Sequence, residues 1–318
     1  MKWKIKAFVQ GAISAMPRSA EINYVFQRYV TRNLPPNSTT LQNNLNTILE
    51  DFAVTRKHIG VPLEKARCFE FGAGATLLGP LTFYCFGIED QTLVDIHRLL
   101  RPELVNCAIH FLREHQDAAF LRMPHEFVPA GMKGQQLIEW LKSTYGISYQ
   151  APCDARHTPF AAGSFDLISS GTVLEHVPKP DIEAILTECK RILREDGVVA
   201  FRIDYQDHYS YFDPKVSVYD FLQYTDAEWR KYSPSLHFTN RLRHRDYLEL
   251  FNAAGLEVLA DVTQEILEED LAALRRLPRA PRFAVYSDHE LAIRTALILS
   301  TKEKVRRTET SAQTLRVQ

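Results

Sequence analysis

Short apolar runs alternate with amphipathic segments along most of the chain, from residue 66 to residue 301. Such alternation is typical of a mainly parallel sheet with helices on both faces. The pattern predicts seven strands, near residues 67–71, 91–96, 147–150, 167–169, 198–203, 257–263 and 291–301. It predicts helices near residues 76–86, 102–115, 134–145, 181–194 and 244–254. The expected fold class is α/β, with one doubly wound, seven-stranded sheet.

The first 60 residues have a different, helical pattern. After a proline-containing stretch at residues 33–40, apolar residues recur at helical spacing, and Ser38 or Thr39 can cap that helix. A loose apolar face also runs along residues 1–16, formed by Trp3, Ile5, Phe8, Val9, Ile13 and Met16. Polar residues interrupt this run and no A-x-A site follows it, which argues against a signal peptide. We expect the helix to pack against the body or a second copy of the chain, forming a homodimer, rather than to contact a membrane.

Composition excludes several classes of protein. With 38 Lys+Arg against 39 Asp+Glu, the net charge of −1 gives no basic excess for nucleic-acid binding. No apolar stretch reaches the ~18 residues of a membrane span. The five cysteines are scattered without a CxxC pair, which predicts free thiols in a cytoplasmic protein. No pair of His or acidic residues has a recognisable ligand spacing, so we expect no metal.

The first predicted strand leads into a glycine turn. Glu70 ends the strand, and Gly72, Ala73 and Gly74 follow it before a predicted helix. Glycine permits a close backbone approach, and helix amides favour an electron-rich ligand. A dinucleotide-binding loop would want a third glycine at position 77, where this chain has Leu77. The turn therefore predicts a ligand site of another kind.

Further motifs follow in order. Asp95 ends the second strand, 21 residues after Gly74, where a carboxylate reaches ribose hydroxyls; the alternative is a helix cap. Asp154 and Ala155 follow the third strand, residues 162–170 lead into the fourth, and residues 172–177 leave it. A Gly-containing turn at residues 193–197 precedes the fifth strand. Each motif also has an ordinary structural interpretation, but five in one order are hard to explain by chance.

In these motifs, residues 60–205 resemble the class I S-adenosylmethionine-dependent methyltransferases, which have a Rossmann-like fold. The resemblance implies that Gly72, Ala73 and Gly74 contact the methionyl part of the cofactor, with Glu70 supporting the turn or the amino group. It implies that Asp95 binds the ribose, and that the adenine contacts Ile96, Asp154 and Ala155. Residues 23–31, 207–213 and 238–243 are also similar to uncharacterised bacterial methyltransferases of polysaccharide and secondary-metabolite gene clusters.

An aromatic-rich segment follows the fifth strand. Residues 205–247 hold 11 aromatic residues in 43 positions, against 11% in the whole chain. We interpret it as a lid over the carboxyl ends of the strands, with an inserted helical pair as the alternative. The expected parts are a helical extension (1–60), a cofactor-binding core (61–204), the lid (205–245) and a final core segment with tail (246–318).

Candidate acceptor-side residues lie in and beside this lid. Histidine has a suitable pKa for a base, which points to His176, His208 beside Asp207, and His237; a structural role is the alternative for each. Tyr205, Tyr209 and Tyr211 are candidate substrate contacts. Arg241 begins a basic cluster with Arg243 and Arg245 that suits an anionic acceptor or, alternatively, a solvated helix face.

These observations predict a methyltransferase that uses S-adenosylmethionine to methylate a small molecule or saccharide, on oxygen rather than nitrogen or carbon. One rival is a non-catalytic subunit of the same fold that binds a partner protein. The other is a nicotinamide-dependent oxidoreductase, which the missing third glycine disfavours.

Overall fold

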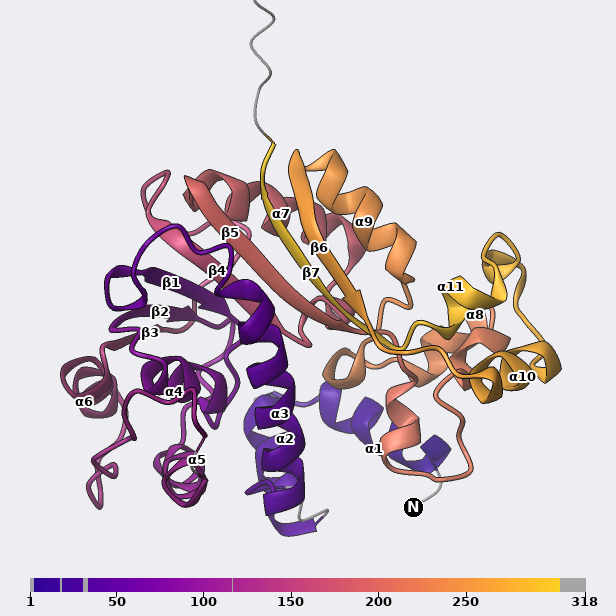
Figure 1. Ribbon diagram of the computed structural model, residues 1–318. Coiled ribbons are helices and arrows are strands. Elements are labelled where there is room, and N and C mark those ends of the chain that lie inside the picture. Colours follow the sequence, from indigo (N-terminus) through magenta and orange to yellow (C-terminus); the bar gives the residue numbers. More distant parts are fainter. Residues whose placement is uncertain (1–2, 18, 31–33, 116, 304–318) are drawn as a thin grey trace, which may run out of the picture.

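The computed structural model describes residues 3–17, 19–30, 34–115 and 117–303 of the 318-residue chain. Its centre is a seven-stranded sheet in the order β3-β2-β1-β4-β5-β7-β6 (Figure 1). The strands are β1 (Arg67–Phe71), β2 (Asp90–Val94), β3 (Ile147–Gln150), β4 (Phe165–Gly171), β5 (Leu193–Asp204), β6 (Leu256–Thr263) and β7 (Thr295–Lys302). β1 to β5 are parallel, and β7 runs antiparallel to both β5 and β6. The prediction of a seven-stranded α/β fold is confirmed.

Helices cover both faces of the sheet. One face carries α3 (Ser38–Thr55), α4 (Leu78–Cys85), α5 (Pro102–Glu114) and α6 (Gln135–Tyr145). The other carries α7 (Lys179–Ile192) and α9 (His244–Ala253). α3 begins after Asn37, whose side chain accepts a hydrogen bond from Thr40 N at 2.8 Å, so the expected caps Ser38 and Thr39 were one or two residues late. No helix in these described ranges is long and apolar enough to cross a bilayer.

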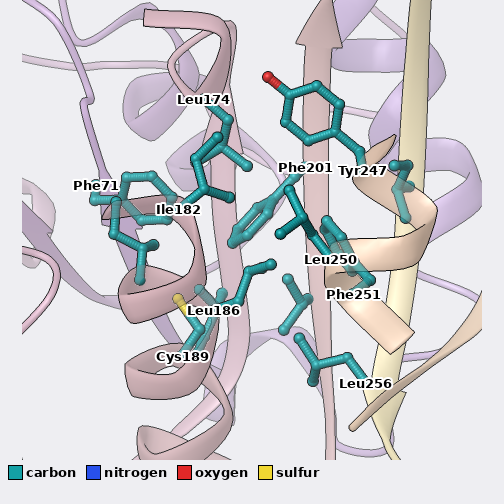
Figure 2. Packing of buried hydrophobic residues seen from close by; sticks show 14 of the residues in the cluster. Phe71, Leu174, Ile182, Leu186, Cys189, Phe201, Tyr247, Leu250, Phe251 and Leu256 are labelled. Atoms are coloured by element: carbon teal, nitrogen blue, oxygen red, sulfur yellow. The ribbon is translucent and has the colours of Figure 1, made fainter. Parts of the chain in front are cut away.

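The face under α7 and α9 holds a continuous apolar core. Ile182, Leu186 and Cys189 of α7 meet Leu250 and Phe251 of α9 above the sheet (Figure 2). Burying each large aliphatic or aromatic side chain of this kind stabilises the fold by about 1.5–3 kcal/mol. All five cysteines are free, as predicted. This packed layer gives the carboxyl ends of β4 and β5 fixed positions.

The aromatic segment after β5 folds into a cap at one end of the sheet. It contains four short 3-10 helices and α8 (Asp226–Trp229). The connection between β6 and β7 packs into the same apolar cluster through α10 (Glu268–Arg276) and α11 (Asp288–Ala292), beside α8 (Figure 1). Residues 291–292 therefore belong to α11 and not to the last strand, because Ser287 caps a new helix by accepting from Glu290 N. We call residues 205–243 and 264–294 together the lid; residues 304–318, the expected tail, lie outside the described ranges.

The first helix, α1 (Trp3–Ser14), packs against this lid, and α2 (Ser19–Val25) follows it. The Trp3 ring lies 4.8 Å from Tyr232 and 5.0 Å from Tyr209, measured between ring centroids. The buried face of α1 differs from the expected apolar face: Lys6, Ala7, Gln10 and Ile13 are buried, whereas Ile5, Phe8 and Met16 are exposed. The face of α1 that packs against the lid thus consists of Trp3 at one end and of mostly small and polar residues along the helix.

Candidate functional site

The turn after β1 lies against the segment that leaves β4. Gly72 and Gly74 have φ angles of 72° and 71°, in the left-handed region that glycine adopts without steric cost. A Cβ atom at Gly72 would lie 2.4 Å from Val173 Cγ2. The turn can therefore approach the β4 exit this closely only with glycine at position 72.

A cavity of about 300 Å³ lies between α3 and the carboxyl ends of β1, β4 and β5. Glu70, Gly72 and Ala73 line it. Its wall also carries an ion pair that sequence reasoning missed, between Asp51 of α3 and Arg202 of β5. A larger cavity, of about 870 Å³, contains none of the predicted site residues and is lined by residues 98–106 and 128–138. The smaller cavity is the candidate cofactor cavity, because the glycine turn forms part of its wall.

Glu70 is half-buried at the wall of this cavity. Burial raises its pKa to about 8, and the nearby Ser169 side chain offsets that rise only in part. Ser169 Oγ is buried and has no hydrogen-bond partner among the described residues. Buried polar atoms are normally paired, so a carboxyl and an unpaired hydroxyl lining one cavity fit a ligand with N–H donors.

The residues expected to hold ribose lie at the end of β2, outside this cavity. Asp95 is buried, and its Oδ1 accepts a hydrogen bond from His97 N at 3.0 Å. Burial raises the pKa of Asp95, while that amide bond opposes the rise. The Ile96 side chain beside it is 59% exposed. An exposed apolar side chain next to a carboxylate suits an adenosine, as the resemblance implied.

Asp154 and Ala155 follow β3 at the same edge of the sheet, and Ala155 packs against the apolar core. The Asp154 carboxylate already pairs with Arg156, whose Nε lies 3.0 Å from both carboxylate oxygens. That hydrogen bond lowers the pKa of Asp154. Arg156 also reaches Asp181 of α7 at 2.7 Å. Asp154 is thus fixed in place by an arginine that sequence reasoning did not consider.

The structure brings the three candidate histidines together. The ring centroids of His176 and His208 are 4.9 Å apart, and those of His208 and His237 are 6.2 Å apart. His176 follows β4, whereas the other two belong to the lid. Burial lowers the pKa of His237 to about 3, which keeps its imidazole neutral.

The carboxylate partner of His208 is Asp204 and not the expected Asp207. Asp204 Oδ2 lies 3.3 Å from His208 Nε2. Asp207 instead caps the following 3-10 helix, with its Oδ1 accepting from Tyr209 N at 2.9 Å. Burial alone would raise the pKa of Asp204, but its contacts with His208 and Tyr211 outweigh burial and lower that pKa.

Glu175 joins this cluster and was also missed. Its side chain is 4% exposed, and neither carboxylate oxygen has a hydrogen-bond partner within the described ranges. Loss of hydration raises its pKa well above the usual value. One signal was present in the sequence, since Glu175 directly precedes His176 after a strand end. We call Glu175, His176, Asp204 and His208 the histidine–carboxylate cluster.

Only one of the three candidate tyrosines contacts this cluster. Tyr211 donates to Asp204 Oδ2, and its ring stacks on His208 with 5.4 Å between centroids. Tyr205 and Tyr209 are buried. Their hydroxyls are used within the protein, by His244 and by the Tyr232 carbonyl respectively. Tyr205 and Tyr209 therefore support the lid from inside.

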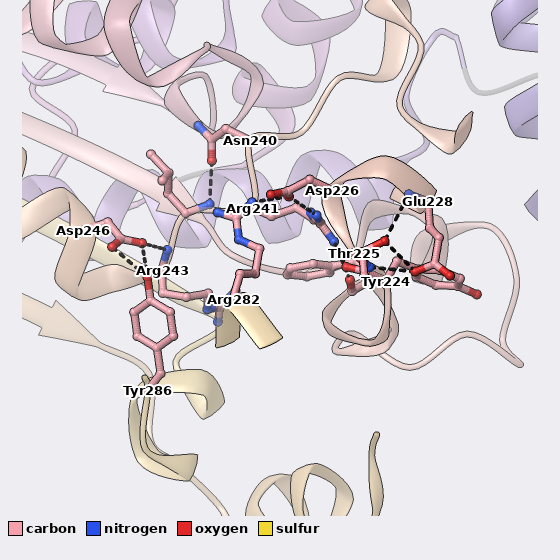
Figure 3. A network of polar contacts seen from close by, with 12 residues as sticks. Tyr224, Thr225, Asp226, Glu228, Asn240, Arg241, Arg243, Asp246, Arg282 and Tyr286 are labelled. Carbon is pink, nitrogen blue, oxygen red and sulfur yellow. Dashed lines mark hydrogen bonds and ion pairs between the residues drawn. The ribbon is translucent and has the colours of Figure 1, made fainter. Parts of the chain in front are cut away.

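Two members of the basic cluster, Arg241 and Arg243, are buried, so the alternative of a solvated face is wrong for these two. Arg241 is 5% exposed and binds the Asp226 carboxylate (Figure 3). It also donates to the Phe221 and Tyr224 carbonyl oxygens. Arg243 is 0% exposed. Because the Arg241 guanidinium already donates its hydrogen bonds to these partners, the geometry gives no support to the expected binding of an anionic acceptor by Arg241.

Comparison with known proteins gives a partial match to one family model and several solved structures. Residues 135–201 match the family model described as "Methyltransferase domain". No curated protein sequence matches the chain. Similar solved structures include the YcgJ protein of Bacillus subtilis, 16% identical over 80% of this chain and 99% of that one, with a TM-score of 0.44. A putative methyltransferase of Bacillus halodurans is 14% identical over 80% and 100%, with a TM-score of 0.42.

Another similar structure is geranyl diphosphate C-methyltransferase of Streptomyces coelicolor, 14% identical over 85% of this chain and 86% of that one, with a TM-score of 0.46. The strand order and the antiparallel β7 show a Rossmann-like fold, and the match over residues 135–201 is to a methyltransferase domain; both are features of the class I S-adenosylmethionine-dependent methyltransferases. The cofactor of that class is S-adenosylmethionine.

Proposed function

We propose that this protein transfers a methyl group from S-adenosylmethionine to a small-molecule or saccharide acceptor, on oxygen in preference to nitrogen or carbon. One observation carries the proposal. The end of β4 and the segment after it line the cofactor cavity with Gly171 and Thr172, and the same segment then supplies Glu175 and His176 to the histidine–carboxylate cluster. Cofactor and acceptor would therefore meet along one short segment at the ligand-binding edge of the sheet.

The cofactor supplies a methyl group on a positively charged sulfur. In this proposal Gly72, Ala73 and Gly74 hold its methionyl part, with Glu70 facing the amino group. Asp95 binds the ribose hydroxyls, and the adenine is held by Ile96, Asp154 and Ala155. The unpaired Ser169 hydroxyl and the half-buried Glu70 carboxyl support this placement.

The histidines face the acceptor side. The acceptor hydroxyl loses its proton to a base, its oxygen bonds to the methyl carbon, and the carbon–sulfur bond breaks with its electron pair on sulfur. His176, His208 and His237 are the candidate bases, and Asp204 orients His208. The lid holds acceptor and methyl group in line, which supplies much of the rate enhancement in such displacements.

We also propose the division of the chain that the sequence suggested: extension 1–60, core 61–204, lid 205–245 and final core segment 246–318. To this division we add residues 264–294, which pack with the lid. We further propose that two copies of the chain form a homodimer through the exposed face of α1.

Calorimetry with S-adenosylmethionine, S-adenosylhomocysteine and NAD tests the cofactor class. We expect the first two to bind and NAD not to bind. Asp95→Ala should weaken the binding of S-adenosylmethionine by about 1–3 kcal/mol, because the ligand loses its hydrogen bonds to a charged group. Asp90→Ala, at the other end of β2, should leave the affinity unchanged. Absence of binding by the wild-type protein would favour the rival of a non-catalytic partner-binding subunit, and a normal affinity of Asp95→Ala would remove Asp95 from the site.

Cofactor binding should also release a proton from Glu70. Its carboxyl, with a pKa of about 8, is mostly protonated at pH 7 and ionises when the cationic amino group arrives. Up to about 0.9 proton per bound cofactor should be released at pH 7, and affinity should rise as the pH increases from 6 toward 8. Calorimetry in buffers with different ionisation enthalpies measures the release, and Glu70→Gln should abolish it. Equal release by wild type and Glu70→Gln would assign the proton to another group.

A further inference from the structure

We propose that Glu175, His176 and His208 bind one divalent transition-metal ion, and that this ion holds a hydroxyl oxygen of the methyl acceptor. The acceptor half of this inference rests on the proposed function, whereas the metal site rests on the cluster alone. The spacing of these residues in the sequence gave no indication of it, because 32 positions separate the two histidines.

The distances fit a single ion. One ligand atom from each of the three residues can be chosen so that all lie within 4.8 Å of one another. Nitrogen and oxygen ligands lie about 2.0–2.2 Å from Zn²⁺, so three ligands of one tetrahedral ion lie about 3.3–3.6 Å from one another. The cluster therefore needs to contract by up to about 1.5 Å, which side-chain rotation of the two histidines and Glu175 can supply.

The hydrogen bonds around the histidines leave nitrogen atoms free to bind. His176 Nδ1 lies 2.7 Å from the Phe238 carbonyl oxygen, so this nitrogen carries the hydrogen and Nε2 is left as a ligand. His208 Nε2 is buried without a hydrogen bond, and Asp204 lies 3.3 Å from it. Ligating histidines commonly donate their other ring N–H to a carbonyl or carboxylate oxygen, as His176 does to Phe238.

Glu175 supplies an independent indication. A buried carboxylate with two unpaired oxygens is unfavourable, because it loses its hydration without replacement. Packing alone gives no reason for a glutamate at this position. A cation between Glu175 and the histidines removes the penalty, and Asp204 adds a second negative charge nearby.

The donor set selects the kind of ion. Two imidazoles and one carboxylate suit Zn²⁺, Fe²⁺ or Co²⁺, whereas Mg²⁺ and Ca²⁺ prefer all-oxygen sites. Three protein ligands leave coordination positions open. A hydroxyl bound there has a lowered pKa, because the ion favours its deprotonated form. The chemistry points to acceptors with a coordinating hydroxyl. With the ion bound, His176 and His208 act as ligands in place of bases, and the hydroxyl proton leaves to water.

The ligands also come from two parts of the molecule. Glu175 and His176 belong to the segment after β4, and His208 belongs to the lid. Binding of the ion would therefore fix the lid to the core beside the cofactor cavity.

The test uses tag-free full-length protein, first treated with a chelator and then titrated with Co²⁺ and, separately, Zn²⁺. We expect one equivalent of either ion in calorimetry, a visible Co²⁺ absorption band, and no saturable binding of Mg²⁺. Glu175→Gln, which keeps the shape of the side chain, and His176→Ala/His208→Ala should each lose at least tenfold in affinity. The exposed His58 provides a matched control, and His58→Ala should bind normally.

Absence of stoichiometric binding by the wild-type protein would overturn the proposal, as would unchanged Co²⁺ affinity in both cluster variants. Circular dichroism verifies that each variant is folded. S-adenosylmethionine affinity, measured in parallel, should be unchanged in folded Glu175→Gln. Loss of cofactor binding in the wild type would refute the proposed function, whereas loss of metal binding alone would refute only the present inference.

Discussion

Replacing Arg243 with methionine is expected to lower the free energy of unfolding by about 3–5 kcal/mol. The Arg243 guanidinium donates to the carbonyl oxygens of Tyr205, Leu291 and Ile293 at 2.7–2.9 Å. Methionine fills a similar volume but donates no hydrogen bond, which leaves three carbonyls unpaired in the interior. Because these carbonyls lie after β5 and before β7, the loss separates both parts of the lid from the core. Denaturant unfolding measures the effect.

Arg245, two residues further on, is the matched control. Its side chain is 41% exposed and pairs with Glu290 at 2.9 Å. Exposed ion pairs contribute about 0–1 kcal/mol, so Arg245→Met should unfold nearly as the wild type does. Equal destabilisation by the two substitutions would show that the Arg243 carbonyl contacts contribute nothing beyond local packing.

Gly72→Ala should both destabilise the protein and reduce cofactor affinity. The left-handed backbone costs about 1–2 kcal/mol for a residue with a Cβ atom. The new Cβ atom would lie only 2.4 Å from Val173 and would displace it. Overpacking of this kind destabilises a core by a further ~1–3 kcal/mol. Moving the β1 turn away from the β4 exit also shifts a wall of the cofactor cavity. We expect at least about a 100-fold loss in S-adenosylmethionine affinity, equivalent to about 2.7 kcal/mol.

Gly74→Ala separates the two contributions. Gly74 has nearly the same φ angle, but a Cβ there meets no atom within 4 Å. It should therefore show only the backbone cost, with a small effect on cofactor affinity. Thermal unfolding and calorimetry of both variants check the comparison. If Gly74→Ala were the more damaging substitution, contact with Val173 would not be what requires glycine at position 72.

The strands could be predicted because buried parallel strands require continuous apolar runs, and these are visible in the sequence. Helix starts were less predictable, since Asn37 and Ser287 cap helices through side-chain geometry. The second part of the lid was missed for a compositional reason. α10 is rich in charged residues and buries only Leu271 and Leu274, so its sequence is typical of an exposed helix.

Some residues of the candidate site could also be predicted from the sequence, and others could not. The glycine turn and Asp95 follow from local spacing along one βα unit. The partner of His208 does not, because Asp207 is nearer in sequence but caps the next turn, leaving Asp204 for the imidazole. Burial of Arg241 and Arg243 was equally hidden, since their acceptors are mostly backbone carbonyls distant in sequence.

The two parts of the lid are inserted at the end of β5 and within the connection between β6 and β7, and β7 lies between those strands in the sheet. Both insertions therefore leave and re-enter the core at neighbouring points. A lid from a related enzyme, joined at these points, could be exchanged as a unit without altering any strand pairing. In such a chimera the donor of the lid would set acceptor preference, while the recipient core would keep its own cofactor affinity.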